Sequence, residues 1–571
     1  MRWSRRDFLQ RSGMTAAAMA GTLGAPMGIL HRNVSVAAKG ETAPGRAGVD
    51  IGYERIDSAQ RQYHVSTGVD NFRFHADLPE IFADAGVTDA WMTTFLYGFW
   101  PYPWDEIDHW VRRLMDVGVR VHFISVPFCH GGGSLDPPDP SGFPNLPPKH
   151  WKTMKRIDGS ENWGWGFHES AMEELCGSVR TMYERYGKCD FFLDDDFRFS
   201  SSPGSMCGCI CDEHRAKFLA DTGTSESKWE QVLDEMRSGT DTELARRWID
   251  WTCDQLTSCF HRMQAAAPQV DLGNMVMFMG SEKSGIRLDD YRDALFRVGE
   301  LMFSDGEFGS IQGRTAELFS ALFHMRFPSS HGRAFSETTI YPPGSLSAAN
   351  MAAKLTVSTI ADTRNTCFMS GLTPIPPEYW TVLKPRMRHE SQIHAKVAGH
   401  RAAGPLKHYW GDAARYFDLG WVGELFCQFL AIGVPFEVCD LPAADGWTFL
   451  GRCDSRAFAD GSAKAPQTKF CVRSDDLSET DVANAPAAMT RLDGTLESLF
   501  AWRREVVIPT LEGTQTPYVE EEVPIVCAWY PTAKAVVLWN LGDETQTLTL
   551  RIGDQRRRVT MAGLESRLVE L

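Results

Sequence analysis

The sequence lacks several features that would assign it to a broad class of protein. Of its 571 residues 74 are acidic and 58 are basic, and beyond the first few positions no Lys/Arg run is long enough to follow a phosphate backbone. It contains no internal repeat at a fixed period and no low-complexity tract. With 43% hydrophobic residues the chain can instead build a large apolar core. We therefore expect a globular protein without a nucleic-acid partner.

The N-terminus carries an arginine pair followed by a mildly apolar stretch. The pair lies within Ser4 to Gln10, a segment rich in alanine and glycine runs from Gly13 to Leu30, and small residues follow from Ser35 to Ala38. This order resembles a twin-arginine export signal. Glycine and proline interrupt the apolar stretch, which is also short for a stable membrane span. We expect residues 1–38 to be removed, which leaves a periplasmic or secreted protein without further membrane contact.

Short apolar runs of strand type alternate with longer amphipathic stretches from about residue 63 to about residue 410, as in repeated β-α units. The eight candidate strands are Tyr63 to Ser66, Ala90 to Phe95, Val119 to Val126, Phe191 to Asp194, Asn274 to Met279, Leu301 to Phe303, Arg333 to Glu337 and Thr366 to Met369. The sequence therefore predicts an α/β fold with a (β/α)₈ TIM barrel over residues 50–400. The chemistry of such a barrel lies at the carboxyl ends of its strands.

Two smaller domains are predicted after the barrel. Strand-like runs at Leu406 to Trp410 and Pro435 to Cys439, with a helical stretch from Gly420 to Ile432 between them, indicate an α/β domain over residues 401–505. Beyond Val506 apolar and polar residues alternate, which indicates a C-terminal antiparallel β-sandwich over residues 506–571.

The densest chemical signal follows the fourth candidate strand, where Asp194, Asp195 and Asp196 precede Arg198. Adjacent anions repel one another, so the pKa of at least one carboxyl should be raised unless a cation lies among them. A raised carboxyl pKa suits a general acid at neutral pH. The alternative is an aspartate-rich loop that caps a helix or holds a structural cation.

A second carboxylate, Glu337, ends the seventh candidate strand. Glycosidic cleavage needs two carboxylates across the sugar from each other, and strands four and seven lie on opposite walls of a barrel mouth. We therefore expect Asp196 and Glu337 to face each other, although a lone glutamate at a strand end is more commonly solvated or ion-paired. At the end of the sixth candidate strand, Glu307 is either a third acidic group for sugar hydroxyls or part of a turn.

A cluster of soft ligands lies just downstream of the aspartates, at Cys207, Cys209, Cys211 and His214. The last three have a spacing that suits a tetrahedral zinc site, and either Cys207 or Cys129 could supply the fourth ligand. Four protein ligands close such a site, so we expect a structural zinc ion that fastens the active-site loop. The alternative is a group of reduced thiols without metal.

Aromatic side chains gather after several candidate strands, and flat apolar faces with a polar edge suit sugar rings. Each alone is more commonly a packing residue, but three groups at neighbouring loops favour a carbohydrate cleft. The candidate sugar contacts are Trp100, Trp165 and His168, and the wider set is Tyr97, Phe99, Tyr102, Trp104, Trp163, Tyr379 and Trp380.

This layout resembles the family 42 β-galactosidases, which have a barrel, an α/β domain used for trimer formation and a small C-terminal β-domain. Their strand four ends in Asp-Asn-Glu, closely followed by a zinc-binding cysteine cluster. The three aspartates from Asp194 to Asp196 match the first motif, Cys207 to His214 matches the second, and Glu337 matches the nucleophile by its order in the chain. The resemblance implies a retaining glycosidase, a structural zinc ion and a homotrimer. Asp196 is one methylene shorter than the family's acid/base glutamate.

The leading hypothesis is a glycoside hydrolase acting on carbohydrate. Asp196 would be the general acid/base and Glu337 the nucleophile, or the base if the enzyme inverts, while Asp195 and Arg198 would orient the acid or the sugar. One alternative is a metal-dependent sugar isomerase or lyase in which the three aspartates bind a catalytic divalent ion. Another is a catalytically inactive barrel that binds glycans.

Overall fold

The computed structural model describes residues 48–96, 98–127, 148, 150–159, 161–162, 168–194, 197, 206–276, 279–298, 302–342, 344–369, 374–418, 422–464 and 468–571. The proposed export signal lies outside these ranges and stays a prediction. In the described part of the chain, none of the helices combines the length and apolar character that a membrane crossing requires.

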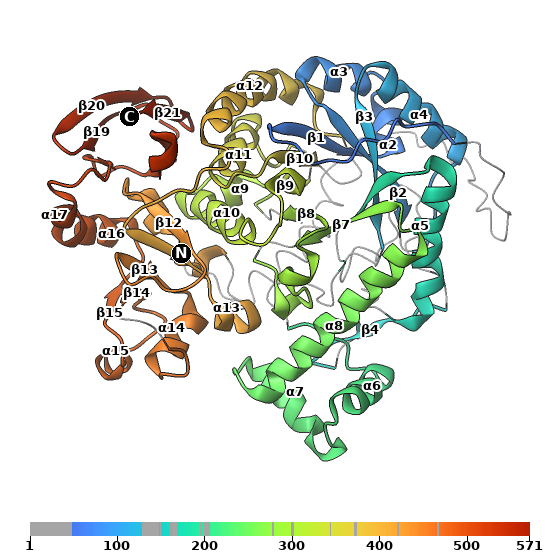
Figure 1. Ribbon diagram of the computed structural model, residues 1–571, viewed down its shortest axis with the longest axis horizontal. Helices are drawn as coiled ribbons and strands as arrows, with labels where there is room; N and C mark the ends of the chain where they lie inside the picture. The colour runs from blue at the N-terminus through green and yellow to red at the C-terminus, as the bar shows by residue number, and fades with distance from the viewer. Residues whose placement is uncertain are drawn as a thin grey trace, which may run out of the picture.

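Eight parallel strands close into a barrel, which confirms the predicted TIM-barrel fold (Figure 1). In chain order they are β1 (Gln62–Thr67), β2 (Asp89–Leu96), β3 (Arg120–Val126), β6 (Cys189–Leu193), β7 (Val270–Val276), β8 (Leu295–Val298), β9 (Ala334–Thr339) and β10 (Asn365–Met369). Strands β1 and β10 pair and complete the ring. A short hairpin, β4 (Met154–Lys155) and β5 (Glu161–Asn162), precedes β6.

Helices surround the barrel, apart from two that pack against another helix (Figure 1). In chain order the helices are α2 (Val69–Phe74), α3 (Leu78–Ala85), α4 (Trp104–Asp116), α5 (Met172–Tyr186), α6 (Asp212–Thr222), α7 (Trp229–Ser238), α8 (Glu243–Ala266), α9 (Asp305–Phe308), α10 (Ile311–His324), α11 (Ala348–Ile360) and α12 (Trp380–Val397). The two exceptions are α6 and α7, which pack against α8. The longest, α8, begins where the Thr242 hydroxyl accepts a hydrogen bond from the Ala245 amide at 3.1 Å, a typical N-cap.

The sixth strand is not where the sequence predicts it. The prediction placed it at Leu301 to Phe303, but β8 spans Leu295–Val298, and Met302 and Phe303 lie beyond it on the way to α9. The apolar run of β8 is interrupted by Arg297, whose side chain is 1% exposed. The hydrophobicity pattern does not indicate this short strand because one of its four residues is charged. The Arg297 side chain can be buried there because its counter-ions lie inside the barrel.

Side chains fill the barrel interior in layers, because alternate residues of a strand face the same side. Along β6 the inward residues are Asp190, then Phe192, then Asp194 just past the strand end; along β9 they are Phe335 and Glu337. The middle layer is an apolar cluster made of Ile56, Trp91, Ile124, Phe192, Met275, Leu295, Phe335 and Cys367. Charged side chains therefore lie on both sides of this apolar layer.

The layer toward the amino ends of the strands is built around His122. Its Nε2 lies 2.8 Å from Asp89 Oδ1, and its Nδ1 lies 2.9 Å from Asp190 Oδ2. Burial alone would lower the pKa of His122, but the carboxylates of Asp190 and Asp89 outweigh it and raise the pKa to about 9. The ring is therefore an imidazolium held between two anions, far from the carboxyl ends of the strands.

Replacing His122 by glutamine should reduce stability in a pH-dependent way. Because the folded pKa of about 9 exceeds the ordinary value of 6.5, the stabilisation is complete below about pH 6.5 and is lost as the pH rises through 9. We expect a pH-dependent part of roughly 3 kcal/mol. Urea unfolding of wild type and His122→Gln at pH 6 and pH 9.5 measures it. A difference in free energy of unfolding that stays constant with pH would contradict this assignment.

A five-stranded parallel sheet follows the barrel, in the order β12-β11-β13-β14-β15. Its strands are β11 (Leu406–Tyr409), β12 (Phe436–Cys439), β13 (Trp447–Phe449), β14 (Lys469–Arg473) and β15 (Met489–Leu492). The associated helices are α13 (Asp412–Phe417), α14 (Arg452–Ala459), α15 (Glu479–Asn484), α16 (Leu496–Trp502) and α17 (Ile508–Leu511), with a π-helical segment, Arg503–Val507, before the last.

The helix predicted over Gly420 to Ile432 is wrong for the described residues from 422 onward. They form only two short 3-10 turns, Val422–Glu424 and Gln428–Ala431. The Gln312 side-chain amide donates to the carbonyls of Val422 at 2.5 Å and Leu425 at 3.1 Å, which an α-helix would use internally.

Two antiparallel sheets form the C-terminal part, as the alternating pattern predicts. One contains β16 (Tyr518–Val519), β19 (Gln546–Ile552) and β20 (Gln555–Met561); the other contains β17 (Ile525–Tyr530), β18 (Ala535–Asn540) and β21 (Ser566–Glu570). Apolar residues from both sheets, including Leu538 and Leu548, share one core. This part lies beside α11 and α12 (Figure 1), where Arg386 Nη2 donates to Leu564 O at 2.9 Å. The domain boundaries themselves stay predictions.

Candidate functional site

Three charged side chains meet at the carboxyl ends of the barrel strands. Arg297 Nη2, from β8, donates a short hydrogen bond to Asp194 Oδ1 at the end of β6. The same nitrogen lies 3.5 Å from Glu337 Oε2, on β9. One guanidinium therefore contacts two carboxylates, Asp194 at the end of the fourth barrel strand and Glu337 on the seventh.

The carboxylate of Glu337 is almost completely buried, with its side chain 4% exposed. Its Oε1 accepts a hydrogen bond from the Thr339 hydroxyl at 2.8 Å. Cys367 pairs in register with Glu337 on the neighbouring strand and lies in the apolar layer below. Burial raises the pKa of Cys367 to about 12, so this neighbour of Glu337 is a neutral thiol.

Several predicted site residues lie outside the part of the chain that the structure describes. They are Asp195, Asp196, Arg198, Trp165 and Cys129, together with Tyr97 and Trp163. Asp194 is described and lies directly after β6. Asp195 and Asp196 follow it in the sequence, and their roles stay predictions.

Two other predicted sugar contacts take part in local packing. Glu307 does not end a strand but lies in α9, where its Oε2 accepts hydrogen bonds from the amides of Phe303 at 2.9 Å and Ser304 at 3.1 Å. This is a capping box, which corresponds to the turn that the sequence left open. The Trp100 ring is half-buried, with its centroid 4.6 Å from that of Trp104.

A second cluster joins two thiols and two imidazoles. The donor atoms of His168, Cys209, Cys211 and His214 all lie within 4.8 Å of one another. Cys211 Sγ is 3.4 Å from His214 Nδ1, and Cys209 Sγ is 3.7 Å from His168 Nε2. Bonds of 2.0 to 2.3 Å to one tetrahedral ion would separate neighbouring ligand atoms by about 3.6 Å. The donor set and its spacing therefore fit zinc.

The surroundings of the cluster favour a metal-binding form. Contact with the Cys209 thiol lowers the pKa of Cys211 although burial opposes it, and contact with His214 adds to the lowering, so the thiolate form of Cys211 is favoured. The Lys155 amide donates to Cys209 Sγ at 3.2 Å. Glu213 Oε2 lies 3.8 Å from His168 Nδ1, on the side of the ring away from the cysteine. Such a carboxylate commonly orients a histidine ligand.

Among the described residues the fourth member of the cluster is His168 and not Cys207, while Cys129 lies outside them. Cys207 is fully buried, and its thiol lies 3.5 Å from the Glu282 carbonyl instead. At Gly208, where φ is +112°, the chain turns between Cys207 and Cys209, so their side chains leave in different directions. His168, predicted as a sugar contact, takes the remaining place. It lies far from the cysteines in sequence, so no spacing pattern could have indicated it.

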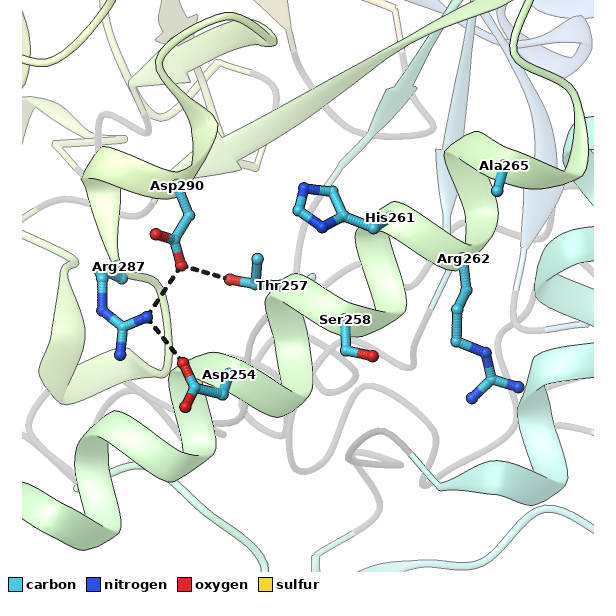
Figure 2. Close-up of a pocket in the computed structure, with 8 residues that line it drawn as sticks. All are labelled: Asp254, Thr257, Ser258, His261, Arg262, Ala265, Arg287 and Asp290. Atoms are coloured by element: carbon cyan, nitrogen blue, oxygen red, sulfur yellow. Dashed lines mark hydrogen bonds and ion pairs between the residues drawn. The ribbon is translucent and has the colours of Figure 1, made fainter.

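A polar depression lies on the outer face of α8, beside the 3-10 turn Leu288–Tyr291. Figure 2 shows Arg287 between Asp254 and Asp290. Arg287 Nη1 donates to Asp254 Oδ1 at 2.8 Å and to Asp290 Oδ2 at 3.2 Å. The Thr257 hydroxyl donates to Asp290 Oδ2 at 2.7 Å. These groups satisfy one another, and none of them belongs to the charged set at the barrel mouth. We do not assign chemistry to this depression.

No family model and no curated protein matches the sequence. Solved structures do match the whole fold. The cold-adapted β-galactosidase from Rahnella sp. R3 aligns with 90% of this chain and 98% of its own, at 10% identity and a TM-score of 0.52. The chain has the fold of β-galactosidases.

Two further structures support the same relationship. The β-galactosidase from the psychrophilic Marinomonas ef1 covers 89% of this chain and 99% of its own, at 11% identity and a TM-score of 0.54. A GH42 β-galactosidase from G. stearothermophilus, solved as a glutamate-to-alanine catalytic mutant, covers 90% and 98%, at 10% identity and a TM-score of 0.54. The resemblance covers about nine-tenths of this chain in each case.

Proposed function

We propose that the protein is a glycoside hydrolase that works with retention, with Glu337 as nucleophile and Asp196 as general acid/base. The observation that carries the proposal is the buried carboxylate of Glu337, paired with Arg297 at the carboxyl end of the seventh barrel strand. It occurs in a fold shared with β-galactosidases over 90% of the chain. A β-galactoside is therefore the first substrate to test.

The proposed chemistry follows from the two strand ends. Glu337 attacks the anomeric carbon while Asp196 protonates the departing oxygen, which gives a glycosyl ester and the free alcohol. Asp196 then takes a proton from water, which attacks the anomeric carbon and releases the Glu337 carboxylate. Retention requires carboxyl groups about 5 to 5.5 Å apart. Support for an acidic group near Glu337 comes from Asp194, two residues before Asp196 in the sequence, because it contacts the same Arg297 nitrogen as Glu337. Asp195 and Arg198 are proposed to orient the acid or the sugar, and Trp165 to stack against the sugar ring.

We also propose that His168, Cys209, Cys211 and His214 hold one structural zinc ion. Four protein ligands leave no open position, so the ion would fasten the segment before α6 and take no part in bond cleavage. Export through a twin-arginine signal and assembly as a homotrimer through the α/β sheet complete the proposal. These last two points rest on the N-terminal sequence and on the family resemblance.

A panel of aryl glycosides tests the proposed activity. Purified wild type and Glu337→Gln are incubated with nitrophenyl derivatives of β-galactose, β-glucose, β-xylose, β-mannose, α-arabinose and their anomers, and chromophore release is recorded. We expect wild type to cleave at least one compound and Glu337→Gln to cleave none above background. A wild type that binds a sugar but cleaves none would favour an inactive glycan-binding barrel.

A further inference from the structure

We propose that Arg297 is the positioning residue of the active site: it aims Glu337 as an anionic nucleophile and, by pairing with Asp194, leaves proton donation to the carboxylates that follow Asp194. This inference rests on the proposed function and deepens it, because it assigns different roles to carboxylates that the sequence presents as equivalent. No spacing in the sequence distinguishes them.

The pairing is enclosed by protein. Arg297 is 1% exposed, and the side chains of Asp194 and Glu337 are 4% exposed. A guanidinium stays charged in proteins, so burying it without anions would be strongly unfavourable. Arg297 also lies over the Phe192 ring, with Cζ 5.6 Å from the centroid, which restricts where the guanidinium can move. The surrounding strands therefore fix the position of the guanidinium.

Glu337 is held at both oxygens. Oε2 faces Arg297 at 3.5 Å, and Oε1 accepts the Thr339 hydroxyl at 2.8 Å. These contacts define the plane of the carboxylate. A buried carboxyl without a cation tends to remain protonated, and a protonated carboxyl is a poor nucleophile. Arg297 supplies the cation, so the nucleophile is ready over a wider pH range.

Asp194 makes the closer contact with Arg297, through a hydrogen bond to Oδ1. A carboxylate paired in this way is stabilised as the anion and cannot serve as a proton donor near neutral pH. Asp195 and Asp196 follow it directly in the sequence. The donor is therefore one of these two, in agreement with the role proposed for Asp196.

The charged and titratable neighbours of Glu337 among the described residues come from three strands. They are Arg297 on β8, Asp194 after β6, and Cys367 on β10, whose thiol is neutral because burial raises its pKa to about 12. Arg297 is the cation of this set. Its removal should thus make Glu337 harder to ionise, and Asp194 would add to that effect by repulsion.

The test compares pH profiles of kcat/KM for the best aryl glycoside in four variants. Arg297→Lys keeps the charge but cannot contact both carboxylates in the same way. Because the charge remains, we expect kcat to fall by about 10- to 100-fold and KM to change by less than about 3-fold, while the acidic limb stays in place. Arg297→Gln combined with Asp194→Asn removes one charge of each sign, so it should fold, and loss of the cation that contacts Glu337 should move its acidic limb up by about one pH unit. Asp194→Asn alone should keep its basic limb.

Arg262→Lys is the matched control, because Arg262 makes a two-pronged ion pair with Glu169 on the protein surface at 2.6 and 2.7 Å. It should leave the profile unchanged. The inference is overturned if Arg297→Lys keeps the kcat of wild type, if the acidic limb stays in place in the variant that combines Arg297→Gln with Asp194→Asn, or if Asp194→Asn alone loses the basic limb. The proposed function fails separately, if wild type cleaves no glycoside.

Discussion

Glu337→Ala should lose about 10⁴-fold or more in kcat/KM for the best aryl glycoside, since the variant has no group to form the glycosyl ester. The truncated side chain also leaves space beside Arg297 where a small anion fits. We therefore expect sodium azide to restore turnover and to give a glycosyl azide of inverted configuration. Chromophore release with and without azide, followed by NMR of the product, provides the measurement.

The matched control is Glu307→Ala, in α9 after the neighbouring strand β8. Glu307 caps α9 through the Phe303 and Ser304 amides, so its loss should reduce stability by about 1 kcal/mol while kcat/KM stays within a few-fold of wild type. Equal activity in Glu337→Ala and Glu307→Ala would remove Glu337 from the mechanism.

Loss of a cluster ligand should affect stability strongly. We expect wild type to carry one zinc ion per chain and Cys211→Ser to carry less than about a tenth of that, because two imidazoles and one thiolate leave the tetrahedron incomplete. The thermal midpoint should fall by roughly 10 °C, since several kcal/mol of metal binding stabilise only the folded state. Elemental analysis and calorimetry measure the two effects.

Cys207→Ser is the control for this experiment, because Cys207 lies four residues before Cys211 but contacts the Glu282 carbonyl. It should retain the metal and show only a modest change in midpoint. Metal loss in Cys207→Ser together with retention in Cys211→Ser would contradict the ligand assignment. Removal of metal by a chelator should lower the midpoint of wild type and not that of Cys211→Ser.

Most of the barrel follows from the sequence because apolar runs alternate with amphipathic helices at a spacing that only β-α repeats produce. The exception is β8, where Arg297 breaks the run Leu295–Val298. Local hydrophobicity cannot register a charge whose partners, Asp194 and Glu337, are supplied by other strands. The segment Gly420 to Ile432 fails for a similar reason, since Gln312 from α10 takes its carbonyls.

The candidate site, too, could be predicted from the sequence only in part. Glu337 could be found because a glutamate that ends a strand of a barrel lies at the mouth by topology alone. Cys209, Cys211 and His214 lie close together in the chain, so their proximity in space is almost assured. His168 joins them through tertiary packing, which also turns Cys207 away toward Glu282. Long-range pairings of this kind have no local pattern.

Trapping of the glycosyl enzyme tests the central claim most directly. Once the preferred sugar is known, its 2-deoxy-2-fluoro glycoside with a good leaving group is incubated with wild type, and the intact protein and its peptides are weighed by mass spectrometry. We expect one sugar per chain, attached to Glu337. A wild type that turns over the parent glycoside yet carries the label on another residue, or carries none, would contradict the claim.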